Sequence, residues 1–260
     1  MINQNPIAAI GRSALGAVAE IGAIFLFAMR GAFAWLSGPF YWRSFFTAAW
    51  HIGFNSLPVV GLTAVFTGAA LALNIYDGSA RFNAETFLPQ ILAVSIVREL
   101  GPGFAALMVA GRSASGMAAE IGAMRVSDQI DAMSTLAVDP FKYLVSPRIL
   151  ATTLMLPFLV LIADAIGIFG GWLVAVYALD FEGAVYIRNI DGFITATDVG
   201  VGLVKAAVFG FLISALGCFY GFRSRGGAQG VGEATRTAVV AAAVAILASN
   251  YVLTSLFMDL

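Results

Sequence analysis

The sequence SIVRELGPG, residues 95–103, places two adjacent charges and a Gly-Pro-Gly triplet inside a long apolar stretch. Consecutive helix positions point about 100° apart, so Arg98 and Glu99 cannot stack on each other along one face. Ionised groups in a lipid-embedded helix are costly and mark functional sites by default. Pro102 removes a backbone donor, which is tolerated there only where protein or a watery cavity covers the freed carbonyl. The segment therefore predicts a helix break beside a functional cavity.

A purely structural interpretation of the same charges stays open at this point. Asp164 in a later apolar segment, or Lys205 in the one after it, could neutralise Arg98 or Glu99 inside the membrane. The coincidence of both charges with the Gly-Pro-Gly triplet favours the functional interpretation.

The composition around this segment is that of a membrane protein. Hydrophobic residues make up 60% of the 260 positions and charged residues 11%, far from the roughly 45–50% and about 25% of soluble domains. Runs long enough to cross about 30 Å of hydrocarbon occur at residues 52–76, 87–110, 149–179, 199–222 and 238–258. They lack the alternation of barrel strands, so we expect an all-α integral membrane protein with five transmembrane helices.

Residues 1–47 are expected to form a unit that precedes the five-span domain at 48–260. Glu20 and Arg30 interrupt their apolar run. Arg12 and Arg30 lie about five helical turns apart and share one face of a helix. This pattern favours an N-terminal amphipathic helix that lies in the membrane interface. A sixth span remains the alternative.

Basic residues fall mainly on one side of the predicted spans. The N-terminal region and the loops after the second and fourth spans carry Arg12, Arg30, Arg43, Arg112, Arg125, Lys142, Arg148, Arg223, Arg225 and Arg236. The opposite side holds Arg81 and Arg188 among several acidic residues. By the positive-inside rule the first side is cytoplasmic, so we expect a cytoplasmic N-terminus and a periplasmic C-terminus.

Residues 120–137, between the second and third spans, have the pattern of one amphipathic helix that ends at Asp139-Pro140. The apolar stripe comprises Val126, Ile130, Met133 and Ala137, and the other side carries Glu120, Ser127, Asp128 and Asp131. Helices that bind membrane surfaces favour basic polar faces, whereas this face is acidic apart from Arg125. The pattern favours docking of a protein partner over a solvated helix on the membrane surface.

Catalytic motifs are absent from the sequence. Neither lysine, Lys142 or Lys205, belongs to a phosphate-binding Gly-x-x-x-x-Gly-Lys-Ser/Thr loop. There is no Gly-x-Ser-x-Gly elbow, and no second His or Cys accompanies His51 at metal spacing. We expect a protein that is not an enzyme and binds no metal or cofactor itself. Any ATP must be hydrolysed by another chain, and the net charge of −1 gives no indication of nucleic-acid binding.

Several linked motifs resemble the MlaE permease family, the membrane subunits of ABC lipid transporters that work with an MCE-domain protein. They are VRELGP at 97–102, AGRSA at 110–114, AEIGAMR at 119–125, LAVDP at 136–140, SPR at 146–148 and GVGEATRTAV at 230–239. The resemblance covers nearly the whole chain, from about Arg12 onward.

The resemblance implies an assembly in the bacterial inner membrane. Two copies of the permease would form a homodimer, with a cytoplasmic ABC ATPase dimer that binds ATP and Mg. A ring of MCE subunits would lie on the periplasmic side, and a STAS-domain protein would bind the ATPase. Phospholipid would pass through a cavity between the two permeases. This transport would support outer-membrane lipid asymmetry.

The resemblance also implies roles for particular residues. Arg98 and Glu99 match the family's charged pair beside the lipid path, and Leu71, Ile75 and Phe82 would belong to its apolar wall. The ATPase would dock on residues 120–137, through the coupling residues Glu120, Arg125, Asp128 and Asp131.

An ion- or proton-coupled secondary carrier that uses the Arg98 and Glu99 pair is the alternative. Asp164 and Lys205 would complete its charged set. Such carriers often contain inverted repeats with paired broken helices, and the Arg-Glu-Leu-Gly-Pro segment occurs once in this sequence. The missing repeat favours the permease.

Overall fold

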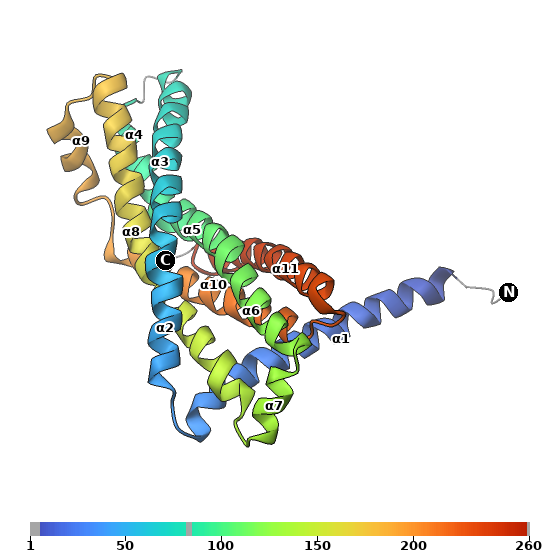
Figure 1. Ribbon diagram of the computed structural model, residues 1–260. Coiled ribbons are helices and arrows are strands. Elements are labelled where there is room, and N and C mark those ends of the chain that lie inside the picture. The colour runs from blue at the N-terminus through green and yellow to red at the C-terminus, as the bar shows by residue number, and fades with distance from the viewer. Residues whose placement is uncertain (1–5, 82–84, 259–260) are drawn as a thin grey trace.

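The computed structural model describes residues 6–81 and 85–258, and helices form almost all of this part of the chain (Figure 1). The α-helices are α1 (Pro6–Phe33), α2 (Trp42–Gly53), α3 (Leu57–Ala80), α4 (Leu88–Ser95), α5 (Gly101–Val109), α6 (Ser115–Val126), α7 (Gln129–Thr135), α8 (Ser146–Ala178), α9 (Gly183–Ile190), α10 (Ala196–Phe222) and α11 (Gly227–Leu256). Turns of π-helix at Ile96–Leu100 and Ala110–Ala114 join α4, α5 and α6, and Phe141–Val145 leads into α8. The predicted all-α fold is confirmed.

Six helical stretches among the described residues are long and apolar enough to cross a membrane. They are Gly11–Leu36, Trp42–Ala80, Leu88–Val126, Phe141–Ala178, Ala196–Phe222 and Gly227–Leu256. The last five correspond to the predicted spans. Two of them, Trp42–Ala80 and Leu88–Val126, contain 39 residues each, which is about 58 Å of helix at 1.5 Å per residue. Both therefore extend well beyond the hydrocarbon layer.

The first candidate span includes most of α1, which contacts α8 and α10 and runs at a steep angle to the direction of α8 (Figure 1). At its C-terminal end the Phe27 ring packs 5.0 Å from Phe141 and 5.5 Å from Phe219. The side chains of residues 11–20 are exposed, and this half of α1 extends away from the other helices. Such a geometry suits a helix that lies along a membrane surface, and that placement stays a prediction.

Helix α8 forms the centre of the fold and contacts α2, α3, α5 and α10. Glycines allow the closest of these contacts, because Gly68 of α3 lies directly against the main chain of Gly167 in α8. Gly217 and Gly221 in the same way bring α10 against α6 and the π-turn before it. Small residues at a spacing of four permit such close approach of membrane helices, so these motifs serve packing.

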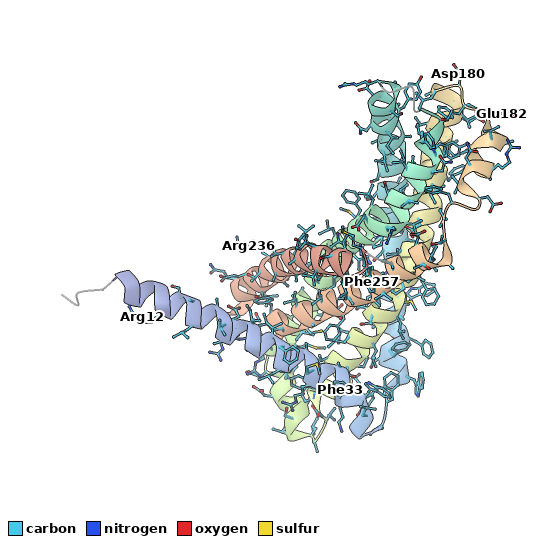
Figure 2. All side chains as sticks on the ribbon, turned by 180° about the vertical axis from the view of Figure 1, so that it is seen from behind. Arg12, Phe33, Asp180, Glu182, Arg236 and Phe257 are labelled. Atoms are coloured by element: carbon cyan, nitrogen blue, oxygen red, sulfur yellow. The ribbon has the colours of Figure 1, made fainter. Side chains whose placement is uncertain are left out.

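A second, smaller apolar cluster lies where α4, α8 and α9 meet. Tyr186 of α9 is buried there with Leu88 and Leu92 of α4. Burial raises the pKa of the Tyr186 hydroxyl, so the phenol stays protonated. Figure 2 places Asp180 and Glu182 at this end of the molecule, far from Arg12 and Arg236. The acidic and basic ends are thus separated along the bundle.

The helix break predicted at Gly101-Pro102-Gly103 does not occur. The chain stays helical from Leu88 to Val126, because the π-turn accommodates Pro102 at the start of α5. The Gly101 N–H donates to the carbonyl oxygen of Ile96, five residues earlier. Pro102 has no N–H to offer the carbonyl of Arg98, and a side chain from α10 bonds to that oxygen instead. The prediction of a break was therefore wrong, although the freed carbonyl is covered by protein as expected.

The single helix predicted at 120–137 is divided in two. Helix α6 ends at Val126, and α7 begins at Gln129 after Asp128, whose φ of 57° is left-handed. Aspartate tolerates this conformation better than most residues. The predicted apolar stripe holds at its centre, where Ile130 is buried in the main core and Met133 packs against it. We name α6, the turn at Asp128 and α7 the α6–α7 hairpin.

Candidate functional site

Arg98 and Glu99 lie on the π-turn Ile96–Leu100, between α4 and α5. π-Turns inside α-helices are rare and are frequent at functional sites. Both side chains bond to groups of α10 and of α11 or the residue after it. The two charged side chains therefore reach the same region of the fold, although side chains at consecutive positions of an α-helix point in different directions.

Lys205 of α10 is the buried centre of this region, with 1% of its side chain exposed. Its Nζ atom donates to Glu99 Oε1 at 2.7 Å, to the Arg98 carbonyl oxygen at 3.0 Å and to Thr254 Oγ1 at 2.8 Å. A lysine ammonium group has three donors, and here each has an acceptor. The buried charge is consequently fully hydrogen-bonded.

Glu99 accepts further hydrogen bonds from α11. Thr254 Oγ1 donates to Glu99 Oε1 at 2.9 Å, and Asn250 Nδ2 donates to Glu99 Oε2 at 3.0 Å. Asn250 and Thr254 are four residues apart, so they lie on the same face of α11. The carboxylate is thus held from two helices.

Arg98 bonds to the ends of the same two helices. Its Nε atom lies 3.5 Å from Asp198 Oδ1, and its NH2 group donates to the Phe257 carbonyl oxygen at 3.2 Å. Asp198 is fixed at the start of α10 by reciprocal hydrogen bonds with Thr195, which form a capping box. Figure 2 shows Phe257 beside the end of α11, within the body of the molecule.

We call Arg98, Glu99, Asp198, Lys205, Asn250 and Thr254 the polar network. Its two cations balance its two carboxylates, which lowers the cost of keeping it inside a membrane protein. Arg98 and Glu99 remain partly exposed, at 30% and 36% of their side chains. The network therefore presents a neutral polar surface of partly exposed charges, anchored by a buried lysine.

Sequence reasoning found part of this network. Lys205 was one of two partners considered for the charge pair, and the structure selects it. Asn250 and Thr254 were missed, although two polar residues four apart in an apolar span were a usable signal. Asp198 is one of the acidic residues on the predicted periplasmic side, and the sequence pattern gave it no role in the site.

Asp164 is not part of the polar network. It lies in α8 against Gly101, where a β-carbon at Gly101 would collide with the Asp164 carboxylate. The side chain is buried, and its Oδ1 atom has no hydrogen-bond partner among the described residues. Asp164 therefore borders α5 and does not neutralise Arg98.

The predicted apolar wall is separate from the polar network. Leu71 and Ile75 of α3 are half-buried and pack against the cluster around Tyr186. Phe82 lies outside the described residues. Within one chain the structure does not bring Leu71 or Ile75 to the charge pair.

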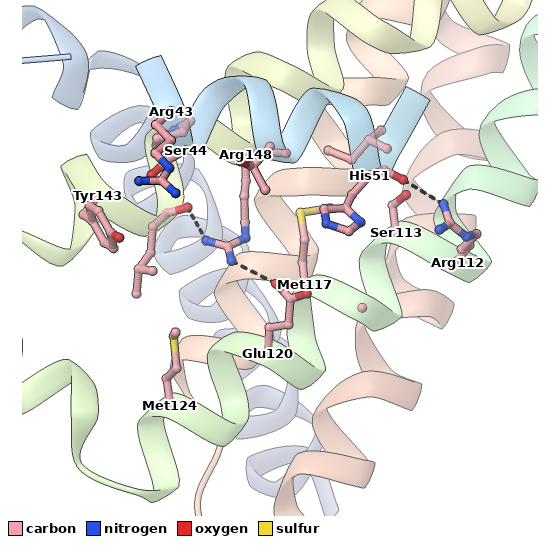
Figure 3. Close-up of a pocket in the computed structure, with 16 residues that line it drawn as sticks. Arg43, Ser44, His51, Arg112, Ser113, Met117, Glu120, Met124, Tyr143 and Arg148 are labelled. Carbon is pink, nitrogen blue, oxygen red and sulfur yellow. Dashed lines mark hydrogen bonds and ion pairs between the residues drawn. The ribbon is translucent and has the colours of Figure 1, made fainter. Parts of the chain in front are cut away.

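The predicted coupling residues fall into two groups on the α6–α7 hairpin. Arg125 NH1 lies 2.6 Å from Asp131 Oδ1, an ion pair that joins α6 to α7, while Asp128 is exposed at the turn between them. Glu120 instead pairs with Arg148 of α8, with 2.9 Å between Oε2 and NH2 (Figure 3). The hairpin is thus closed internally and tied to α8.

Comparison with known proteins places the chain in a family. The family model for Permease MlaE matches residues 45–256. A probable ABC transporter permease protein of Rickettsia felis is 46% identical over 248 residues, covering 95% of this chain and 96% of the relative. The chloroplast protein TRIGALACTOSYLDIACYLGLYCEROL 1 of Arabidopsis thaliana is 35% identical over 224 residues, 85% of this chain and 63% of that protein. The intermembrane phospholipid transport system permease protein MlaE of Haemophilus influenzae is 33% identical over 206 residues, 79% of each.

The helical membrane fold and these matches define the membrane subunit of an ABC transporter, a permease. The chain belongs to the MlaE permease family, and the resemblance inferred from its motifs is confirmed.

Proposed function

We propose that this permease moves phospholipids between the inner membrane and a periplasmic MCE-domain protein, and so supports outer-membrane lipid asymmetry. The observation that carries the proposal is the polar network, a neutral group of partly exposed charges on apolar helices. A phospholipid needs an apolar path for its tails and a polar site for its headgroup. Arg98 and Glu99 supply the polar site, and Leu71, Ile75 and Phe82 belong to the apolar wall. The name of the Haemophilus relative supports this substrate class.

The working unit in this proposal is a homodimer of the permease. Arg98 and Glu99 of each copy lie beside a shared lipid cavity, and Leu71 and Ile75 line it from α3. Both α3 residues are only half-buried in one chain, which leaves apolar surface for lipid. The periplasmic MCE ring receives or delivers the lipid at the acidic end of the bundle, near Asp180 and Glu182.

Energy for transport comes from a cytoplasmic ABC ATPase dimer, which binds ATP and Mg and docks on the α6–α7 hairpin. A STAS-domain protein binds that ATPase. Asp128 and Asp131 offer exposed carboxylates to the ATPase. Glu120 ties the hairpin to α8, and Arg125 joins α6 to α7 within it. The helix from Leu88 to Val126 is continuous, and about 24 Å of it separates Glu99 from Ser115, where the hairpin begins. Movement of the hairpin is transmitted along this helix to the polar network.

The orientation in the proposal follows the distribution of basic residues. The N-terminus, the α6–α7 hairpin and the loop between α10 and α11 lie in the cytoplasm, and the C-terminus is periplasmic. The family match to ABC permeases argues against a secondary carrier.

The test is ATP-dependent lipid transfer by the purified complex. The permease is reconstituted in vesicles with its ATPase and MCE partners, and transfer of a fluorescent phospholipid between vesicle and MCE protein is followed. Glu99→Gln removes one charge of the polar network, and we expect it to reduce transfer about tenfold or more while the complex still assembles. Asp77→Asn at an exposed ion pair on α3 is the matched control. Absence of ATP-dependent transfer by the wild-type complex would overturn the proposed function.

A further inference from the structure

A cleft of about 510 Å³ lies between α2, α6 and the start of α8 (Figure 3). Its volume falls within the roughly 300–1,000 Å³ of small-molecule sites. None of Arg98, Glu99 and Lys205 is among its lining residues. The cleft is therefore separate from the polar network and carries a chemistry of its own.

The cleft has an excess of positive charge. Arg43, Arg112 and Arg148 line it, and Glu120 is the only carboxylate among the lining residues. Arg148 NH1 donates to the Leu144 carbonyl oxygen at 2.9 Å, in addition to its ion pair with Glu120. The remaining two guanidinium groups have no carboxylate in the cleft.

The arginines differ in how firmly they are held. Arg112 NH1 donates to the His51 carbonyl oxygen and to Ser56 Oγ, both at 2.9 Å, which fixes it against α2. Arg43, by contrast, has no hydrogen bond or ion pair within residues 6–81 and 85–258. Figure 3 shows it extending from α2 on the same side as Arg148. An exposed guanidinium beside two fixed ones is suited to bind a ligand that carries negative charge.

Two neighbouring faces of α2 indicate where the cleft lies relative to the membrane. Arg43, Thr47 and His51 recur every four residues and face the cleft. The neighbouring face carries Trp42, Phe46 and Trp50 at the same spacing, and Phe54, just after α2, continues the series; all four are exposed. Exposed aromatic rings of this kind gather at the level of lipid headgroups. The basic cleft therefore opens next to a surface that suits the headgroup region of a bilayer.

We propose that this cleft binds the phosphate group of a glycerophospholipid at the membrane interface. Guanidinium groups bind phosphate oxygens through paired, charge-assisted hydrogen bonds. Arg43 makes the direct contact, and Arg112 adds a fixed positive charge. Arg148, whose charge is balanced by Glu120, borders the site, and the acyl chains lie along the aromatic face of α2. The inference rests on the proposed phospholipid transport and adds a headgroup site distinct from Arg98 and Glu99.

The test compares two lipids that differ only in the phosphate. Phosphatidic acid and diacylglycerol with the same brominated chains are titrated into the purified full-length protein in neutral detergent, and quenching of tryptophan fluorescence reports binding near Trp42 and Trp50. We expect phosphatidic acid to bind and diacylglycerol to bind much more weakly. Arg43→Gln should weaken phosphatidic acid binding about tenfold, the effect of one charge-assisted hydrogen bond, and Arg43→Lys should restore part of it. Arg12→Gln, which removes a charge from α1 outside the cleft, should leave binding unchanged.

A second variant fills the cleft without touching a charge. Gly116 lines it, and a β-carbon there meets no atom within 4 Å, so Gly116→Leu should also weaken binding about tenfold while the protein folds. Unchanged phosphatidic acid binding by both Arg43→Gln and Gly116→Leu would overturn the proposal. Inorganic phosphate that displaces the lipid at equal concentration would assign the cleft to a soluble phosphate ester and overturn the lipid assignment. Failure of this inference is distinguishable from failure of the proposed function. If the proposed function is wrong, the wild-type complex transfers no lipid, whether or not the cleft binds phosphatidic acid.

Discussion

Lys205 donates to the carbonyl oxygen of Arg98 across 3.0 Å. That oxygen is the one that Pro102 cannot bond, because it lies four residues earlier and proline has no N–H. One buried lysine thus satisfies both a freed backbone acceptor and the carboxylate of Glu99. The stability of the helix around Pro102 consequently depends on α10.

Replacing Lys205 with methionine should lower the free energy of unfolding by about 2 kcal/mol. Removal of one partner of a buried ion pair costs about 3–5 kcal/mol, and the partial exposure of Glu99 reduces that figure. Thermal unfolding of the purified protein in detergent measures the loss. Arg81→Gln, which breaks an exposed pair with Asp77, should cost less than about 0.5 kcal/mol. Equal stability of Lys205→Met and wild type would show that the network contributes nothing.

Pro102→Ala should recover about 1 kcal/mol in the Lys205→Met background. Alanine returns an N–H near the carbonyl oxygen of Arg98, so the acceptor that lost Lys205 gains a backbone donor. The same substitution in the wild-type protein should have a smaller effect, because that oxygen is already bonded. A double-mutant cycle on the unfolding free energies measures the difference. Additive effects of the two changes would contradict the assignment of Lys205 to this carbonyl.

Replacing both Asp128 and Asp131 with lysine should release the ATPase from the purified complex. The change reverses the charge that the α6–α7 hairpin offers to its partner, and it removes the Arg125 ion pair. Co-purification of the ATPase with the permease is the readout. Asp128→Gly serves as a second variant, since glycine adopts the left-handed turn at no cost and loses only the carboxylate. Retention of the ATPase by the lysine variant would exclude these residues from docking.

Gly68→Leu should destabilise the fold by about 3 kcal/mol or prevent its assembly. A β-carbon at Gly68 collides with the main chain of Gly167 in α8, and backbone atoms yield less readily than side chains. Gly78→Leu on the same helix is the matched control, because its β-carbon meets no atom within 4 Å. The two variants are compared by the yield of folded protein purified in detergent and by the unfolding temperature. Similar behaviour of both variants would place the α3–α8 contact elsewhere.

The spans were predictable because hydropathy reports burial in lipid directly, residue by residue. The course of the chain at Gly101-Pro102-Gly103 was not predictable, because it depends on Lys205. Lys205 lies about a hundred residues further along the chain, and the packing of α10 sets its position. Local sequence predicts that Pro102 frees a carbonyl. Only the fold shows which donor bonds to it.

The region 120–137 gives a similar lesson. Its periodicity predicted an apolar stripe, and Ile130 of that stripe is buried in the main core. The turn at Asp128 interrupts the helix yet leaves Ile130 in place, so periodicity alone could not reveal it. The Arg125 to Asp131 ion pair exists only because of that turn.

The backbone contact between Gly68 and Gly167 differs in kind from the contact of the Glu99 turn with α10 and α11. At this contact the main chains of α3 and α8 meet with no side chain between them, so separating the two helices loses van der Waals contact that no side chain can replace. The seam between the Glu99 turn, α10 and α11 is built from groups that water or a lipid phosphate can satisfy equally well. The α3–α8 contact is therefore the rigid one. Motion that leaves the fold intact occurs at the contact of the Glu99 turn with α10 and α11.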